Sequence, residues 1–359
     1  MNGITNRMRW LGVLVVLLVA SPTLVKAETK EDEAIAKFLK KLTKSKYLTI
    51  QGRVFSDFSV DLTKGDKTKE TAFEITRAYL TFKSEIVKWL RVRVTADFSR
   101  WLQSDDDSPL LGFIKYAYFD VRPCKGLSIK MGQHDTPWIE TFQHAFGYRF
   151  VHKVYQDHFK TMSSAELGAS LNGDFFGHRL RFTAGIFNGT GYKKPAGKRP
   201  FEELLYLVQV SYYPLANRKG FAKNFGIHGY FSHNQNKDDA GAVVRTMLYG
   251  GGVSLNNKWM RFGAEVIVRQ DNAGGRTNRD YILGGYLSGH YKGWGIFGQV
   301  GANVAPDRSG NSTDLDFVAG ISYQPIYQFV VALDYQQAWH AKFKDTTGHK
   351  VFVHTAVFF

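Results

Sequence analysis

The chain has 359 residues, a formal net charge of +15 and 44% hydrophobic residues. Its single cysteine, Cys124, excludes an internal disulfide framework, and we expect no special role for it. Aromatic residues at 15% and 35 glycines exceed ordinary usage. The mean hydropathy of −0.26 suits either a soluble protein or a membrane protein whose apolar side chains occupy alternate positions.

The first 27 residues resemble a secretory signal. Arg7 and Arg9 precede a short apolar stretch at residues 10–20, and Ala27 closes a plausible cleavage site. The apolar stretch is too short for a transmembrane helix, which needs about 20 residues. We therefore interpret residues 1–27 as a signal peptide and expect the mature chain to begin near Glu28.

Residues 28–47 follow a helical pattern. Ile35, Phe38, Leu39 and Leu42 recur at helical spacing, with acidic residues before them and lysines after them. We expect a short periplasmic helical segment here, or alternatively a partly disordered leader.

From residue 48 to residue 359, short alternating segments are separated by turns. Apolar and polar residues alternate with a period of two, which is typical of a β-strand with one apolar face. The predicted strands are 48–61, 73–83, 89–100, 112–121, 127–135, 163–172, 178–188, 204–213, 225–233, 245–255, 259–269, 280–290, 294–304, 314–323, 327–338 and 351–359. These segments predict an all-β fold, a transmembrane antiparallel barrel of about sixteen strands.

The connections and the end of the chain support a barrel. Connections after even-numbered strands are mostly short, such as 256–258, whereas those after odd-numbered strands are longer and polar, such as 63–70. This order matches the periplasmic turns and extracellular loops of outer-membrane barrels. The last strand ends on Phe359, which resembles the C-terminal signature of such proteins. Trp89, Trp259 and Trp294 follow short turns and could form an aromatic girdle.

Alternation also predicts where basic side chains point. In the strand 89–100, for example, Val92 and Val94 belong to the lipid face, so Arg91 and Arg93 face the lumen. An arginine on the lipid face near the midplane would cost about 2–4 kcal/mol. The same reasoning turns further basic residues inward, and together the set is Arg53, Arg91, Arg93, Lys130, Arg179, Arg181, Arg261 and Arg269. These residues could favour anions in the pore, or they could pair with lumenal acids such as Asp57, Asp97 and Glu265 and brace the wall.

The longest connection, from residue 136 to about residue 162, is too aromatic for a surface loop. We expect it to fold into the lumen and narrow the channel, with Arg149, Lys153 and Lys160 lining the constriction. Its three histidines, His144, His152 and His158, lack the close spacing of metal ligands, so we predict neither a metal site nor a cofactor.

Four stretches resemble a known family: residues 74–82 (EITRAYLTF), 89–99, 115–119 (KYAYF) and 127–133 (LSIKMGQ). In order and spacing they are similar to the N-terminal part of the phosphate-selective porin O and P family. The resemblance implies a sixteen-stranded trimeric barrel with a basic pore for phosphate or polyphosphate. It makes Arg77, Arg91, Arg93 and Lys130 candidate pore residues.

We therefore expect an outer-membrane porin that passes small solutes without catalysis and prefers anions. The main alternative is a barrel that sheathes or anchors a partner such as a multihaem cytochrome. An outer-membrane hydrolase is less well supported, because Ser288 and His290 form the nearest approach to a catalytic pair. We expect small anions, membrane lipids and two further copies of the chain as partners, and no nucleic acid. Lipopolysaccharide phosphates are the expected partner of outer-loop residues, namely Lys193, Lys194, Lys198 and Arg199.

Overall fold

The computed structural model describes residues 48–63, 70–100, 110–193, 200–237, 241–306, 312–340 and 347–359. The expected signal peptide (1–27) and the expected helical segment (28–47) lie outside the described residues. So do Lys194, Lys198 and Arg199.

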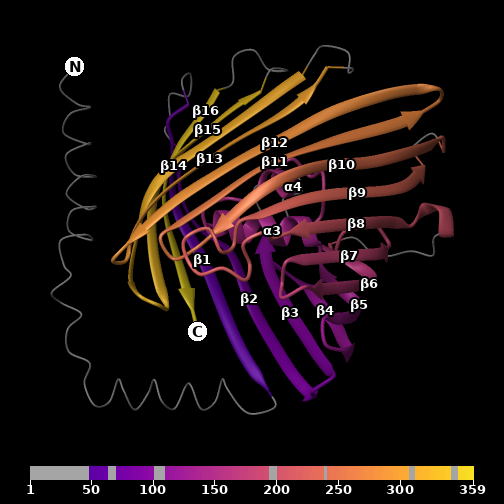
Figure 1. Cartoon of the computed structure of the whole chain (residues 1–359). Coiled ribbons are helices and arrows are strands. Elements are labelled where there is room, and N and C mark those ends of the chain that lie inside the picture. Colours follow the sequence, from indigo (N-terminus) through magenta and orange to yellow (C-terminus); the bar gives the residue numbers. More distant parts are fainter. Residues whose placement is uncertain are drawn as a thin grey trace, which may run out of the picture. The chain divides into compact units, whose positions relative to one another are not determined.

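Within these ranges the chain forms sixteen strands, as the alternation predicts. In Figure 1 they follow one another around a single curved wall. Their bounds are β1 Thr49–Asp61, β2 Thr71–Val87, β3 Leu90–Arg100, β4 Leu110–Cys124, β5 Leu127–Asp135, β6 Ala165–Phe175, β7 Leu180–Phe187, β8 Leu205–Tyr212, β9 Gly226–Lys237, β10 Val243–Asn256, β11 Met260–Ala273, β12 Arg276–Tyr291, β13 Trp294–Ala305, β14 Ser312–Ile326, β15 Phe329–His340 and β16 Thr347–Phe358. Each strand pairs with its neighbours in sequence, and β16 pairs antiparallel with β1, so the barrel is closed.

The two faces of the wall differ as the pattern predicts. In β11, Val266 is 41% exposed on the outside, whereas Ile267 beside it is fully buried inside. Exposed apolar side chains of this kind recur around the outer surface, including Phe98, Met131 and Ile296. A band of apolar side chains facing outward is what a lipid bilayer stabilises.

The barrel closes where the two ends of the strand sequence meet. The backbone N–H of Gly52 donates to the carbonyl of Phe359 at 2.7 Å, which extends the pairing of β1 with β16. A Cβ on Gly52 would lie 2.0 Å from the Phe359 ring, so the terminal aromatic ring lies over the space that glycine leaves open. The carboxyl-terminal phenylalanine therefore has a packing role at the seam.

The connections keep the predicted asymmetry with two exceptions. At the short-turn end, β2 and β3 are joined across residues 88–89, and β12 and β13 across residues 292–293. The connection 213–225, between β8 and β9, lies at this same end but is much longer. At the opposite end, Gly274 and Gly275 alone join β11 to β12, both with positive φ. Positive φ favours glycine, which explains how this tight turn forms.

The three tryptophans of the expected girdle lie at the short-turn end, and each is between 43% and 55% exposed. Trp294 packs against Tyr323, with ring centroids 4.6 Å apart. Among the described helices, none combines the length and the apolar character needed to cross a membrane.

Candidate functional site: an inward segment and a cationic cluster

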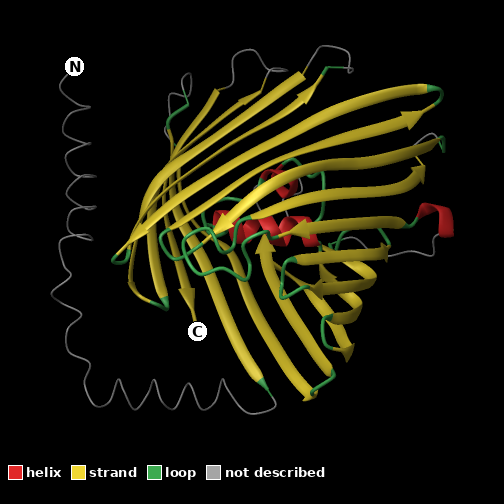
Figure 2. Cartoon of the chain, viewed as in Figure 1, coloured by secondary structure: helices red, strands yellow, loops and turns green. Residues whose placement is uncertain are grey.

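The connection 136–164, which we call the inward segment, folds inside the barrel as expected. It contains α3 (Pro137–Phe146) and α4 (Tyr155–His158), and Figure 2 shows both helices within the wall of strands. Pro137 stands in the first turn of α3, and Gly147 ends the helix with φ of 80° and an N–H bond to the carbonyl of Gln143. The apolar residues of α3 are all buried, so this helix is held by packing.

One side of α3 packs on the inner faces of β9 to β12. Trp138 contacts Tyr230 with ring centroids 5.5 Å apart, and Phe142 contacts His228 at 5.8 Å. Glu265 on β11 accepts hydrogen bonds from the Trp138 indole and from the Tyr286 hydroxyl. The carboxylate is therefore enclosed by donors that join the segment to the wall.

The rest of the segment is held by further strands. The Tyr148 hydroxyl lies 2.9 Å from Ser322 Oγ on β14 and 3.2 Å from His290 Nε2 on β12. The Tyr155 hydroxyl donates to the backbone carbonyl of Asp316 at 3.1 Å. A Cβ on Gly301 of β13 would lie 2.3 Å from the Tyr155 ring, so that glycine makes room for it. These contacts fix the segment against β9–β14.

The opposite side of the segment faces β1 to β4, where basic residues gather. Arg77 Nη1 and Lys115 Nζ both donate to the Tyr79 hydroxyl, at 2.7 Å and 3.2 Å. Asp97 is fully buried and lies 3.6 Å from Arg77. Phe150 of the segment lies beside Phe55 of β1, with ring centroids 6.2 Å apart.

The inward segment and a second loop complete this group. Arg149 lies 3.4 Å from Asp157 within the segment. From the connection 188–204, Tyr192 donates to Asp97 at 2.7 Å and Lys193 to Ser99 at 3.0 Å. We call the resulting set the cationic cluster; in the described residues it combines five basic side chains with two carboxylates, namely Arg77, Lys115, Arg149, Lys153 and Lys193 with Asp97 and Asp157.

The charges in the cluster perturb one another. Burial raises the pKa of Asp157, but Lys153 and Arg149 outweigh it and hold that pKa below its ordinary value. Arg77 and Lys115 of the wall act in the same direction. Asp157 raises the pKa of Lys153, but burial and the guanidinium groups of Arg149 and Arg77 together outweigh it and hold that pKa below its ordinary value. The wall and the segment are thus close enough for the charges of both to act on the same carboxylate and on the same part of the lumen.

A second basic group lies toward the short-turn end. Arg53 and Lys83 are exposed there, and Arg93 lies 4.2 Å above the Tyr116 ring. A Cβ on Gly147 would collide with the guanidinium of Arg261, so Arg261 lies against the C-terminus of α3, where a helix favours positive charge. Residues of α3 also line a cavity of about 880 Å³, to which Arg181, Arg218, Lys219 and Lys223 contribute basic side chains.

On the same face of α3, Glu140 and His144 form a pair 3.0 Å apart. The bond to Glu140 raises the pKa of His144, while burial opposes it. Burial raises the pKa of Glu140, but the bond from His144 and the charge of Arg93 lower it below its ordinary value.

Several expected pore residues instead pair with acids on the wall. Arg91 lies 2.7 Å from Glu85, and Lys130 lies 2.9 Å from Asp135. Two more pairs are Arg181 with Asp174 at 3.4 Å and Arg269 with Asp271 at 3.0 Å. Arg179 lies in the turn before β7, where its Nε is buried without a hydrogen-bond partner. The bracing role that we considered as an alternative therefore accounts for four of these residues.

The sequence analysis missed two members of the cationic cluster; of the other three, Arg77 came from the family resemblance and Arg149 and Lys153 from the long connection. The pairing of β3 with β4 shifts register between Thr95 and Ala96, and this bulge buries both Lys115 and Tyr116. Strict alternation would have turned Lys115 outward. Lys193, which we assigned to lipopolysaccharide, instead binds Ser99 on the wall, and no strand pattern in the loop could have indicated this.

Two of the three histidines of the inward segment, His152 and His158, are engaged in packing. His158 Nε2 lies 2.8 Å from Asp316 Oδ2, and the rings of His152 and His158 are 4.6 Å apart. Burial, followed by the neighbouring charge of His158, lowers the pKa of His152 to about 3. Over the described ranges, no three acidic, histidine or cysteine side chains are grouped to hold a metal ion.

Comparison with known proteins supports the same fold. A family model described as Phosphate-selective porin O and P matches residues 48–140, which confirms the resemblance seen in the sequence. No curated protein matches the chain.

Many solved structures are similar in fold. The anion-selective porin from Comamonas acidovorans has a TM-score of 0.65 and 10% identity, covering 87% of this chain and 99% of its own. The channel DcaP of Acinetobacter baumannii has a TM-score of 0.64 and 12% identity, covering 87% and 97%. The trimer form of OmpT from Vibrio cholerae has a TM-score of 0.60 and 9% identity, covering 87% and 99%. The family match covers residues 48–140, and these solved structures share the fold of the closed barrel.

Proposed function

We propose that this chain, whose residues 48–140 match the phosphate-selective porin O and P family, is an outer-membrane porin for passive diffusion. It prefers anions and selects phosphate among them. The observation that carries the proposal is the cationic cluster. Five basic side chains there surround two carboxylates, in a narrow space between β2–β4 and the inward segment. An excess of fixed positive charge beside a low-dielectric wall raises the local concentration of anions and repels cations.

Burial decides how these residues act. Lys115 is 4% exposed, so it contributes to the field in the pore more than to direct contact with a solute. Arg53 and Lys83 are exposed, and Arg93 is half-buried, so these three are the better candidates for direct binding. Guanidinium groups suit phosphate because they present paired donors.

The lumen also argues against the main alternative. A barrel that sheathes another protein needs a wide, open interior. Here the inward segment occupies the lumen and is held there by Trp138, Tyr148 and Tyr155. This arrangement favours a diffusion channel for small solutes.

We propose further that the protein is a homotrimer and that its outer apolar band contacts membrane lipids. An outward groove of about 340 Å³, lined by Phe58 and Phe73 of β1 and β2 and by Val353 of β16, is a plausible contact surface between copies. The trimer form of the similar OmpT from Vibrio cholerae supports this assembly. Migration of the unheated, detergent-solubilised protein at three times the monomer mass is the expected result.

The proposed selectivity can be tested by adding phosphate to single channels that conduct chloride in planar bilayers. Saturable block of the chloride current at low phosphate concentration is the expected result. A chloride-preferring channel without block would leave a general anion porin and contradict phosphate selection. Failure to form any channel would contradict the porin function itself.

A further inference from the structure

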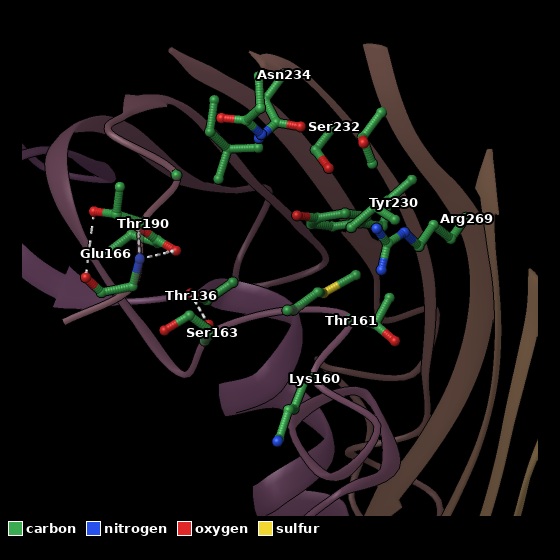
Figure 3. Close-up of a pocket in the computed structure, with 17 residues that line it drawn as sticks. Thr136, Lys160, Thr161, Ser163, Glu166, Thr190, Tyr230, Ser232, Asn234 and Arg269 are labelled. Carbon is green, nitrogen blue, oxygen red and sulfur yellow. Dashed lines mark hydrogen bonds between the residues drawn. The ribbon is translucent and has the colours of Figure 1, made fainter. Parts of the chain in front are cut away.

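A second cavity, at the long-loop side of the barrel, differs in chemistry from the cationic cluster. It has a volume of about 250 Å³ and lies between the start of β6 and the inner faces of β9 to β11. Figure 3 shows Glu166, Thr190 and Ser163 on one side of it, with Ser232, Asn234 and Arg269 on the other.

Three charged side chains line this cavity, and two of them, Arg269 and Glu166, are engaged with protein partners. The third, Lys160, is exposed, and its ammonium points away from Ser232 and Asn234 in Figure 3. Arg269 Nε lies 3.0 Å from Asp271 Oδ2, and Thr246 donates to the other oxygen of that carboxylate at 2.6 Å. Glu166 is buried, and both of its oxygens accept the Gly191 N–H at 3.0 Å. The part of the cavity around Ser232 and Asn234 therefore offers a ligand little net charge, in contrast to the cationic cluster.

The remaining lining is neutral and polar, with a few apolar patches. Thr161, Ser232 and Asn234 contribute hydroxyl and amide groups. Met162 and Leu248 contribute apolar surface, and both side chains are largely buried. Hydroxyl and amide groups can donate to and accept from the hydroxyls of a solute, whereas apolar patches suit C–H groups.

The position of these residues follows from the strand pattern. Ser232 and Asn234 are alternate residues of β9, so both side chains turn to the lumen, and Thr246 pairs with Asn234 in register on β10. Tyr230 precedes them on the same face and packs on Trp138 of α3 at 5.5 Å. One wall of the cavity is thus rigid and is supported by the inward segment.

We propose that this cavity binds one uncharged, hydroxyl-rich solute, such as a polyol or a single monosaccharide ring. A sugar ring combines hydroxyls at its edge with C–H groups on its faces, and the lining matches both. The volume is smaller than that of pockets for drug-sized ligands, which span about 300–1,000 Å³, and so suits one ring rather than a chain. The site goes beyond the proposed anion transport and does not depend on it.

Saturation-transfer NMR with D-glucose and the full-length protein in detergent tests this proposal. The wild type is expected to give saturable transfer to glucose. Asn234→Leu and the milder Ser232→Ala are each expected to weaken binding, by about tenfold for Asn234→Leu, since two hydrogen bonds to one amide are lost. The matched control is Asn303→Leu on β13, which lies outside the lining of this cavity and should bind like the wild type.

Absence of saturation transfer from the wild-type protein to glucose would overturn the proposal. So would equal weakening in Asn303→Leu, or displacement of glucose by phosphate, which would indicate a charged site. The wild-type melting curve, retained in each variant, shows that the barrel is folded. Because detection in detergent needs no ionic current, failure of the channel function would leave this test unaffected.

Discussion

The inward segment meets two very different walls. Toward β9–β14 it packs aromatic rings into positions that glycine leaves open, and its polar atoms bond to Glu265, Ser322 and Asp316. Toward β1–β4 it faces Arg77, Lys115 and their neighbours. The first wall positions the segment and the second supplies the charge. The comparison teaches that the selectivity we propose depends on both walls, because the anchored side sets how close the segment's Arg149 and Lys153 come to the basic side.

Reversing a charge on the basic wall should have the largest effect. Lys115→Glu places a negative charge among Arg77, Tyr79 and Asp97. We expect the chloride-to-potassium permeability ratio to fall by about tenfold, which corresponds to about 1.4 kcal/mol. Zero-current potentials of single channels measure the ratio, and Lys115→Gln should shift it in the same direction by less.

The matched control for that change is Lys258→Glu. Lys258 lies in a short turn, with its ammonium over the Trp259 ring. If this control lowered the ratio as much as Lys115→Glu, total charge rather than the cationic cluster would set selectivity.

Changes in the anchored wall, β9–β14, should affect the pore by moving the inward segment. In Gly301→Val the new side chain occupies the space of the Tyr155 ring, at an expected cost of about 1–3 kcal/mol. We expect the segment to be displaced, which would raise conductance and weaken anion preference together. Gly298→Ala on the same strand meets only ordinary contacts and should behave like the wild type. Unchanged conductance in a folded Gly301→Val barrel would show that the segment does not narrow the pore.

A smaller change on the anchored wall is Glu265→Gln. The amide keeps one carbonyl acceptor, so either the Trp138 indole or the Tyr286 hydroxyl loses its partner. We expect this to destabilise the barrel by about 1–3 kcal/mol and to increase current noise. Thermal unfolding in detergent measures the first effect. Glu85→Gln, on an exposed pair with Arg91, serves as the control and should change the melting temperature little.

The smallest expected effect is a pH dependence from His144. Its pKa is raised by Glu140, so the histidine is charged at low pH and loses its proton as the pH rises above about 6.5 through the raised value. The pKa of Glu140 is lowered, so its carboxylate stays ionised across this range. The stabilising contribution of the pair is thus present below pH 6.5 and lost above the raised pKa. We expect anion preference to decline slightly over the same interval, and His144→Gln to abolish that step.

The sequence predicted the regular parts of this molecule well. Residues with period-two alternation, such as Arg91 to Phe98, form a strand with the expected face inward, because a bilayer outside and water inside enforce one parity. The aromatic composition of residues 136–162 was also sufficient to place that connection in the lumen. Both predictions rest on the cost of burying or exposing the wrong side chains.

The site was less predictable for two physical reasons. A β-bulge reverses parity without a local sequence signal, and this places Lys115 inside. Whether a lumenal arginine is paired depends on cross-strand neighbours, and the register that brings Lys130 opposite Asp120 and near Asp135 is not visible in one strand alone. The glycine at 301 is meaningful only once Tyr155 is known to lie against it.

The central claim, that the basic wall makes the pore prefer anions, is tested most directly by the zero-current potential of the wild-type channel between unequal potassium chloride solutions. We predict the sign that indicates faster passage of chloride than of potassium, and a decrease in its magnitude as salt increases and screens the cluster. A potential of the opposite sign, or one near zero at low salt, would contradict the account.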